Sequence, residues 1–187
     1  MLLGYALCGS FCTHSASLDA LCRLLAAGHD VVPIVSERVA STDTRFGRAQ
    51  DLLARLHSLT GRECISSVRE AEPLGPVSPL DALIIAPCTG NTLAKMARGI
   101  TDSAVTMAAK AHLRTDRPLL IALATNDAMS ANLSSLAAML TRKGVYFVPM
   151  RQDDPEKKPH SLVADFARID DALVMMMQGR QIRPLFI

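Results

Sequence analysis

Short apolar segments recur along the chain, each about as long as a β-strand. Nearly continuous apolar runs of this length are typical of strands in a sheet that is covered on both faces. The pattern predicts five strands, at Leu2–Leu7, Val31–Val35, Ala82–Ala86, Leu119–Ala124 and Val145–Val148.

Between these segments, apolar residues recur at the spacing of amphipathic helices. Leu18, Leu21, Cys22 and Leu25 mark the first helix, and Gly28 stands where a left-handed residue would end it. Further helices are predicted over Phe46–Leu59, Asn91–Arg98, Ser103–Ala111, Leu133–Leu140 and Ile169–Met177, and proline-rich loops over Glu70–Pro79 and Gln152–Pro159.

Strands and helices therefore alternate, which predicts a parallel, right-handed, doubly wound sheet. We expect a Rossmann- or flavodoxin-like α/β fold in three layers, α/β/α. The 187 residues fit a single domain, 1–187, with a C-terminal loop and helix from about residue 151. The chain is 49% hydrophobic but only 4% aromatic, so alanine, leucine, valine and methionine must build the core.

Charge and cysteine usage narrow the range of partners. A net charge of +2 is too small to indicate nucleic acid or an anionic membrane. No apolar run is long enough to span a bilayer, and the start shows no charged leader or cleavage site. The five cysteines form no C-x-x-C pair and do not lie near histidines at metal-ligand spacing. We expect free thiols, no metal site and a cytoplasmic location.

Small polar residues follow four of the predicted strands, at the end where ligands bind in such sheets. Glycine lets backbone N–H groups approach an anion, hydroxyls donate to it, and a helix start adds its positive dipole end. Each segment alone has a plainer explanation as a tight turn or a helix cap. Together they favour a phosphate, and because G-x-G-x-x-G is absent, a mononucleotide rather than a dinucleotide. The segments are Gly9–Ser10, Ser36, Thr89–Gly90–Asn91–Thr92 and Thr125–Asn126.

The segment Ala86–Lys95, A-P-C-T-G-N-T-L-A-K, is followed by G-I-T-D at Gly99–Asp102. It resembles the P-A-x-x-N-T-x-A-K…G-I-x-D signature of the homo-oligomeric flavin-containing cysteine decarboxylases and the related flavin prenyltransferases. Asn126 falls where the decarboxylases have the asparagine of a P-x-M-N substrate clamp, although the flanking proline and methionine are missing. The resemblance implies a flavin mononucleotide (FMN) site formed by Gly9, Ser10, Ser36, Thr89, Gly90, Asn91 and Thr92.

Four further segments resemble the family of dipicolinate synthase B subunits of spore-forming bacteria. They are Cys8–Thr13, Thr42–Gly47, Ala71–Pro76 and Gln152–Pro159. The resemblance implies an oxidoreductase component that works with a separate A subunit during sporulation. The pair would oxidise a dihydrodipicolinate-like ring to pyridine-2,6-dicarboxylate, with NADP or NAD on the A subunit. The resemblance to the wider decarboxylase superfamily, whose members form homo-trimers or larger shells, implies a homo-oligomer.

Two kinds of cation are candidates for holding the substrate carboxylates. Arg45 follows a polar loop and opens a predicted helix; it is either a solvated arginine or a bidentate carboxylate ligand. Lys157 and Lys158 are either solvated loop residues or part of a lid. No catalytic residue emerges, because His14 and Cys8 are more simply read as structural and the segment Arg69–Pro79 lacks the histidine that the decarboxylases carry there.

Two other functions stay open. One is a stand-alone flavin-dependent decarboxylase or prenyltransferase, and the other is a non-catalytic partner that stabilises the A subunit. Aromatisation removes two hydrogens and no side chain can accept them, so the leading function requires a flavin here, a nicotinamide in the partner, or both.

Overall fold

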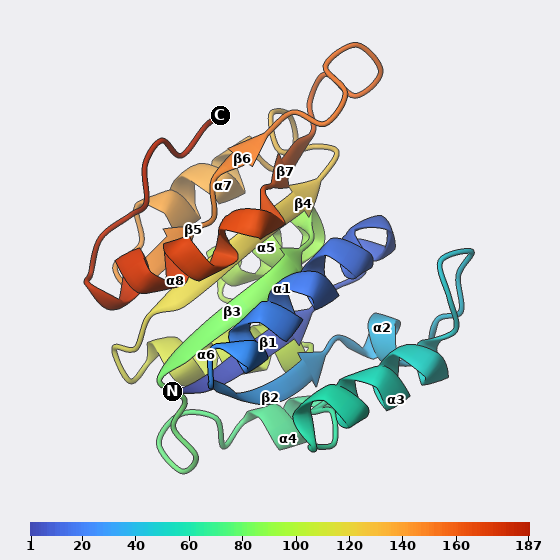
Figure 1. Cartoon of the computed structure of the whole chain (residues 1–187). Coiled ribbons are helices and arrows are strands. Elements are labelled where there is room, and N and C mark those ends of the chain that lie inside the picture. Colours follow the sequence, from blue (N-terminus) through green and yellow to red (C-terminus); the bar gives the residue numbers. More distant parts are fainter.

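One sheet of seven strands runs through the protein (Figure 1). The computed structural model describes residues 1–187. Parallel strands lie in the order β2-β1-β3-β4, and β5 pairs with β4 in parallel, so the five predicted strands are confirmed. Their bounds are β1 (Leu2–Leu7), β2 (Asp30–Val35), β3 (Ala82–Cys88), β4 (Leu119–Thr125) and β5 (Val145–Phe147).

The central strands are buried on both faces, which explains their unbroken apolar sequences. In β1, Leu3 and Tyr5 belong to one apolar cluster, whereas Ala6 belongs to the other. The same alternation continues in β3 and β4, because successive side chains of a strand point to opposite faces. The core therefore consists of two clusters separated by the sheet.

Helices cover both faces, which confirms the three-layer arrangement (Figure 1). The first cluster, on the face toward the viewer, contains side chains of α1 (His14–Ala26), α2 (Glu37–Ser41), α3 (Ala49–Thr60) and α8 (Ile169–Met177). The second cluster contains side chains of α4 (Val68–Ala71), α5 (Gly90–Arg98), α6 (Ala104–Leu113) and α7 (Leu133–Leu140). Short 3₁₀ turns, η1 (Phe11–Thr13) and η2 (Phe166–Arg168), precede α1 and α8. No helix is both long enough and apolar enough to cross a bilayer.

The sheet is not wholly parallel, so that part of the prediction was wrong. After the parallel strands the chain forms β6 (Met150–Arg151) and β7 (Leu162–Ala164). β7 runs antiparallel both to β4 and to β6. The region from residue 151 is therefore a hairpin followed by a helix, not simply a loop and a helix. Strands of two and three residues are too short to show a periodic pattern of apolar residues in the sequence, so they were not predicted.

One predicted helix start was also wrong. The helix expected from Phe46 begins at Ala49, because Thr44 and Gly47 exchange backbone hydrogen bonds in a tight turn (3.0 and 3.1 Å). Asp43 then accepts a hydrogen bond from the Ala49 N–H (2.9 Å). Arg45 therefore lies in a turn and does not open a helix.

Each of the outermost strands has part of its outward backbone already hydrogen-bonded within the protein. Beside β2, the Ile65 N–H donates to Pro33 O and Ile65 O accepts from Val35 N–H (3.0 and 2.8 Å). Beside β5, the Gln181 side chain bonds both backbone groups of Phe147 (2.9 and 2.7 Å). Beside β6, the C-terminal residues 185–187 bond both backbone groups of Met150.

Candidate functional site

The predicted phosphate-binding segments lie at one edge of the sheet. Parallel strands place their carboxyl ends together, and β2, β1, β3 and β4 are neighbours. The Ser36 N–H donates to Leu7 O (3.0 Å), and the Thr92 hydroxyl of α5 reaches the Cys8 sulfur after β1 (3.3 Å). The structure thus brings the four segments to one place, and their binding of a cofactor stays a prediction.

Several of the hydroxyls at this edge are already engaged. Thr89 caps α5, accepting from the Thr92 N–H (3.3 Å) and donating to the Thr92 hydroxyl (3.1 Å). Ser36 caps α2 by accepting from the Val39 N–H (3.3 Å), which leaves its own proton free. The Ser10 hydroxyl contacts only the Cys12 sulfur, at 3.9 Å. The hydroxyl protons that remain for a ligand are therefore those of Ser10 and Ser36.

Backbone donors complete an arrangement that suits an anion. The N–H groups of Gly9, Phe11 and Cys12 after β1, and of Gly90 and Asn91 at the start of α5, have no acceptor within the protein. The nine-residue helix α5 adds its positive dipole end to the last two. This edge thus offers two sets of free N–H donors and two hydroxyl protons.

A polar network that the sequence did not predict closes the edge at β4. The Asp127 carboxylate accepts from the Thr125 hydroxyl and from the Asn132 amide (2.8 Å). Asn132 is only 7% exposed, and its Oδ1 has no partner. The network packs against Gly90, where a Cβ atom would lie 2.5–2.7 Å from three of its polar atoms. Asn126, the residue predicted instead, is exposed and makes no side-chain hydrogen bond.

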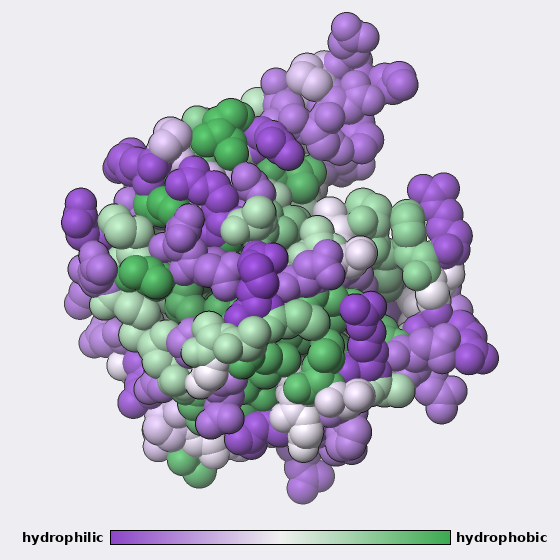
Figure 2. Space-filling view, in the orientation of Figure 1, coloured by the Kyte–Doolittle hydropathy of each residue, from purple (hydrophilic) through white to green (hydrophobic).

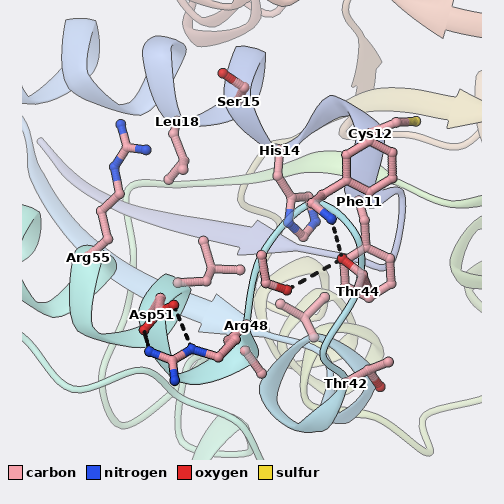
Figure 3. Close-up of a pocket in the computed structure, with 15 residues that line it drawn as sticks. Phe11, Cys12, His14, Ser15, Leu18, Thr42, Thr44, Arg48, Asp51 and Arg55 are labelled. Atoms are coloured by element: carbon pink, nitrogen blue, oxygen red, sulfur yellow. Dashed lines mark hydrogen bonds and ion pairs between the residues drawn. The ribbon is translucent and has the colours of Figure 1, made fainter.

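A cavity of about 360 Å³ lies beside this edge (Figure 3). One wall comes from η1 and α1, the segments that directly follow Gly9–Ser10, and the other from the residues between α2 and α3 and from α3 itself. Arg45 does not line it; its guanidinium lies over the Phe46 ring, 4.8 Å from the centroid. The charged and aromatic residues of the lining, apart from His14, are Phe11, Phe46, Arg48, Asp51 and Arg55.

His14 lines the cavity in a fixed orientation. Its Nε2 lies 2.8 Å from Cys8 O, and its ring is tilted against Phe11 at a centroid distance of 5.2 Å. A carbonyl oxygen can only accept, so Nε2 carries the proton and Nδ1 is left as an acceptor. Burial lowers the pKa of His14, so the ring stays neutral at pH 7.

The cysteines at the edge are not activated. Burial raises the pKa of the Cys8 thiol to about 11, although the hydrogen bond from Thr92 acts in the opposite direction. Burial also raises the pKa of Cys88 well above its ordinary value. Both thiols are therefore protonated at neutral pH, which suits a packing role and not a nucleophile.

The two candidate lysines lie on a hydrophilic loop that projects beyond β4 (Figures 1 and 2). Lys158 is paired with Asp153 (2.6 Å), whose carboxylate also accepts from the Ser161 hydroxyl. Asp154 accepts from the Lys157 N–H (3.0 Å), and the Lys157 ammonium makes no ion pair. Both aspartates therefore stabilise the loop, and of the two lysine charges only that of Lys157 is unpaired.

We expect the free energy of unfolding to fall as the pH is lowered through about 6.5. Burial lowers the pKa of both His14 and His112, so the folded protein stays neutral at these sites while the unfolded chain takes up protons. The slope should reach at most about 1.4 kcal/mol per pH unit for each histidine, and it should end once the folded histidines also protonate. Urea unfolding at several pH values between 7.5 and 5 measures it.

The matched variants are His14→Gln with His112→Gln, against His160→Gln. His160 is exposed and makes no ion pair, so it serves as the control for substitution of a histidine that is not buried. A double variant that keeps the full slope would show that neither buried histidine is its source.

Known proteins share this fold and, in part, this sequence. The chain is 40% identical to the B subunit of dipicolinate synthase from Bacillus subtilis, over 99% of this chain and 92% of the relative. The crystal structure of the B subunit of dipicolinate synthase from Bacillus halodurans is 38% identical, has a TM-score of 0.91 and is matched over 100% of this chain and 95% of that one. The FMN-dependent cysteine decarboxylase SpaF shares the fold at 22% identity and a TM-score of 0.62, over 94% and 97% of the two chains. The Flavoprotein family model matches residues 4–176. The chain therefore belongs to the Flavoprotein family and, within it, to the family of dipicolinate synthase B subunits.

Proposed function

We propose that this chain works with an A subunit to oxidise a dihydrodipicolinate-like precursor to pyridine-2,6-dicarboxylate. The observation that carries the proposal is the 40% identity to a dipicolinate synthase B subunit over nearly the full length of both chains. Removal of two hydrogens from the ring needs an electron acceptor, and the side chains of this protein supply none. The acceptor is FMN on this chain, a nicotinamide on the A subunit, or both in sequence.

FMN fits the carboxyl edge of the sheet. Its phosphate would be held by the free N–H groups of Gly9, Gly90 and Asn91 and by the Ser10 and Ser36 hydroxyls. Thr89 and Thr92 would shape this site through their own hydrogen bonds, because their protons are already donated. A bound flavin would supply a two-electron acceptor beside the cavity at η1 and α1.

The test of the cofactor is the visible spectrum of the purified chain, followed by titration of the apoprotein with FMN. We expect Ser10→Ala to weaken FMN affinity about tenfold or more, because a hydrogen bond to a charged phosphate contributes roughly 1.5–3 kcal/mol. Ser41→Ala is the control, since that hydroxyl donates to Glu37 O within α2. Equal affinities of the Ser10 variant and the wild type would remove Ser10 from the phosphate site.

Reconstitution tests the reaction and the partner together. The chain is mixed with the A subunit, the dihydro precursor and NADP or NAD, and pyridine-2,6-dicarboxylate is measured. Synthesis that requires both proteins supports the proposal. If the A subunit synthesises the product in the absence of this chain, and this chain only raises the stability of the A subunit, its role is the non-catalytic one instead.

A further inference from the structure

The cavity beside η1 has two walls of different character (Figure 3). The α1 side presents Leu18 and the Phe11 ring, and the α3 side presents Leu52 with two arginines. The volume of about 360 Å³ lies in the range of small-ligand sites. It thus combines an apolar interior with a few charged groups, as binding sites for small molecules do.

Aromatic rings are concentrated in this cavity. The whole chain has five phenylalanines, two tyrosines and no tryptophan, yet Phe11 and Phe46 both line this one cavity. Phe46 is 54% exposed and belongs to neither apolar cluster, so core packing does not account for it. Ring faces of this kind favour a planar, aromatic ligand.

The charges of the lining favour an anion. Arg48 donates two hydrogen bonds to Asp51 (both 2.9 Å), so this pair is neutral overall. Arg55 reaches from α3 toward the α1 side and has no carboxylate within ion-pair distance (Figure 3). Arg48, Asp51 and Arg55 are the only charged side chains of the lining, because His14 is neutral. The cavity thus keeps one unpaired cation, and it is a guanidinium.

We propose that this cavity binds an aromatic carboxylate, with Arg55 as the ligand of a carboxylate group and the ring against Phe11 and Phe46. The inference rests on the proposed function, whose substrate and product are aromatic or near-aromatic dicarboxylates. A planar guanidinium pairs with a carboxylate through two parallel hydrogen bonds, which fixes the ligand plane as well as its charge. Arg55 takes the role that the sequence assigned to Arg45, which lies outside the cavity on the Phe46 ring.

The experiment is calorimetric titration of the whole chain with pyridine-2,6-dicarboxylate in a buffer free of divalent cations. We expect Arg55→Gln to weaken binding about tenfold or more and Arg55→Lys to recover only part of the loss. Glutarate, which has two carboxylates but no ring, should bind the wild type at least tenfold more weakly. Arg62→Gln is the matched control, because Arg62 is exposed just beyond α3, makes no ion pair and lies outside the cavity.

Thermal unfolding of each variant checks that an exposed substitution on α3 has not changed the fold. If Arg55→Gln binds the ligand as tightly as the wild type, the proposal that this cavity is the binding site is wrong. The proposed reaction would not be affected by that result. If the chain does not bind pyridine-2,6-dicarboxylate although the reconstituted enzyme synthesises it, the binding proposal is also wrong. If binding depends on Arg55 but the reconstituted proteins synthesise no pyridine-2,6-dicarboxylate, the binding proposal is supported and the proposed reaction is rejected.

Discussion

Asp127→Ala should lower the free energy of unfolding by about 3 kcal/mol. The Asp127 carboxylate accepts hydrogen bonds from the Thr125 hydroxyl and the Asn132 amide, and a hydrogen bond to a charged group contributes roughly 1.5–3 kcal/mol. Asn132 is buried and its Oδ1 already lacks a partner, so the variant would leave this side chain without any. An orphaned buried amide costs more than the lost bond alone.

Urea unfolding monitored by circular dichroism measures this loss. Asn126→Ala is the neighbouring control: the side chain is exposed and unbonded, so its stability should stay within about 0.5 kcal/mol of the wild type. Asp127→Asn retains the shape of the side chain but weakens both hydrogen bonds. Its free energy of unfolding should therefore lie between those of Asp127→Ala and Asn126→Ala. A loss below about 1 kcal/mol for Asp127→Ala would mean that the network contributes little to stability.

Gly90→Ala should destabilise the protein by about 2–3 kcal/mol, although alanine is the better helix former. Helix propensity alone would favour the variant by at most about 1 kcal/mol, the value for a helix interior, because Gly90 is the first residue of α5. The new Cβ, however, would lie 2.5 Å from Thr125 Oγ1 and 2.7 Å from both Asn132 Nδ2 and Asp127 Oδ1. Overpacking of this kind typically costs 1–3 kcal/mol, and here it also separates hydrogen-bonded groups. Because α5 must shift, we expect FMN affinity to fall as well.

The same unfolding experiment tests this variant. Gly9→Ala is the control for stability, because its Cβ would meet nothing closer than 3.5 Å. In the Asp127→Ala background, Gly90→Ala should cost clearly less, since the clash and the network share atoms. Additive losses in the double variant would show that Gly90 acts through a different contact.

The sequence predicted the parallel part of the fold because its signal is local. The strand-length apolar run at Leu119–Ala124 and the helical spacing of Leu18 and Leu21 reflect which faces are buried. β7 has only three residues, and its place beside β4 depends on a hairpin that no local pattern specifies. The short helix α2 likewise escaped prediction, since five residues show no period.

The candidate site was predictable only where its residues are consecutive in sequence. Small polar residues after each strand identified the carboxyl edge, because their position relative to the strand is fixed by the fold. Arg55 is one of three arginines between residues 45 and 55, and nothing local shows which of them lines a cavity with its charge unpaired. Asp127 and Asn132 meet Gly90, which lies 37 residues or more away along the chain, so only the tertiary fold brings them together.

The occupied outer strands limit how copies of this chain can associate. Strand addition requires a row of unpaired backbone groups, and short, covered edges prevent it. The backbone near Pro33 is already bonded to Ile65, that of Phe147 to Gln181, and that of Met150 to the C-terminal residues. At these residues the edges offer no free backbone groups to a strand of another copy, which disfavours an intermolecular sheet and fibril-like growth from the native state. The homo-oligomer that the sequence predicts, and the proposed complex with the A subunit, would then rest on side chains of helices and loops, where single substitutions can separate one interface from another.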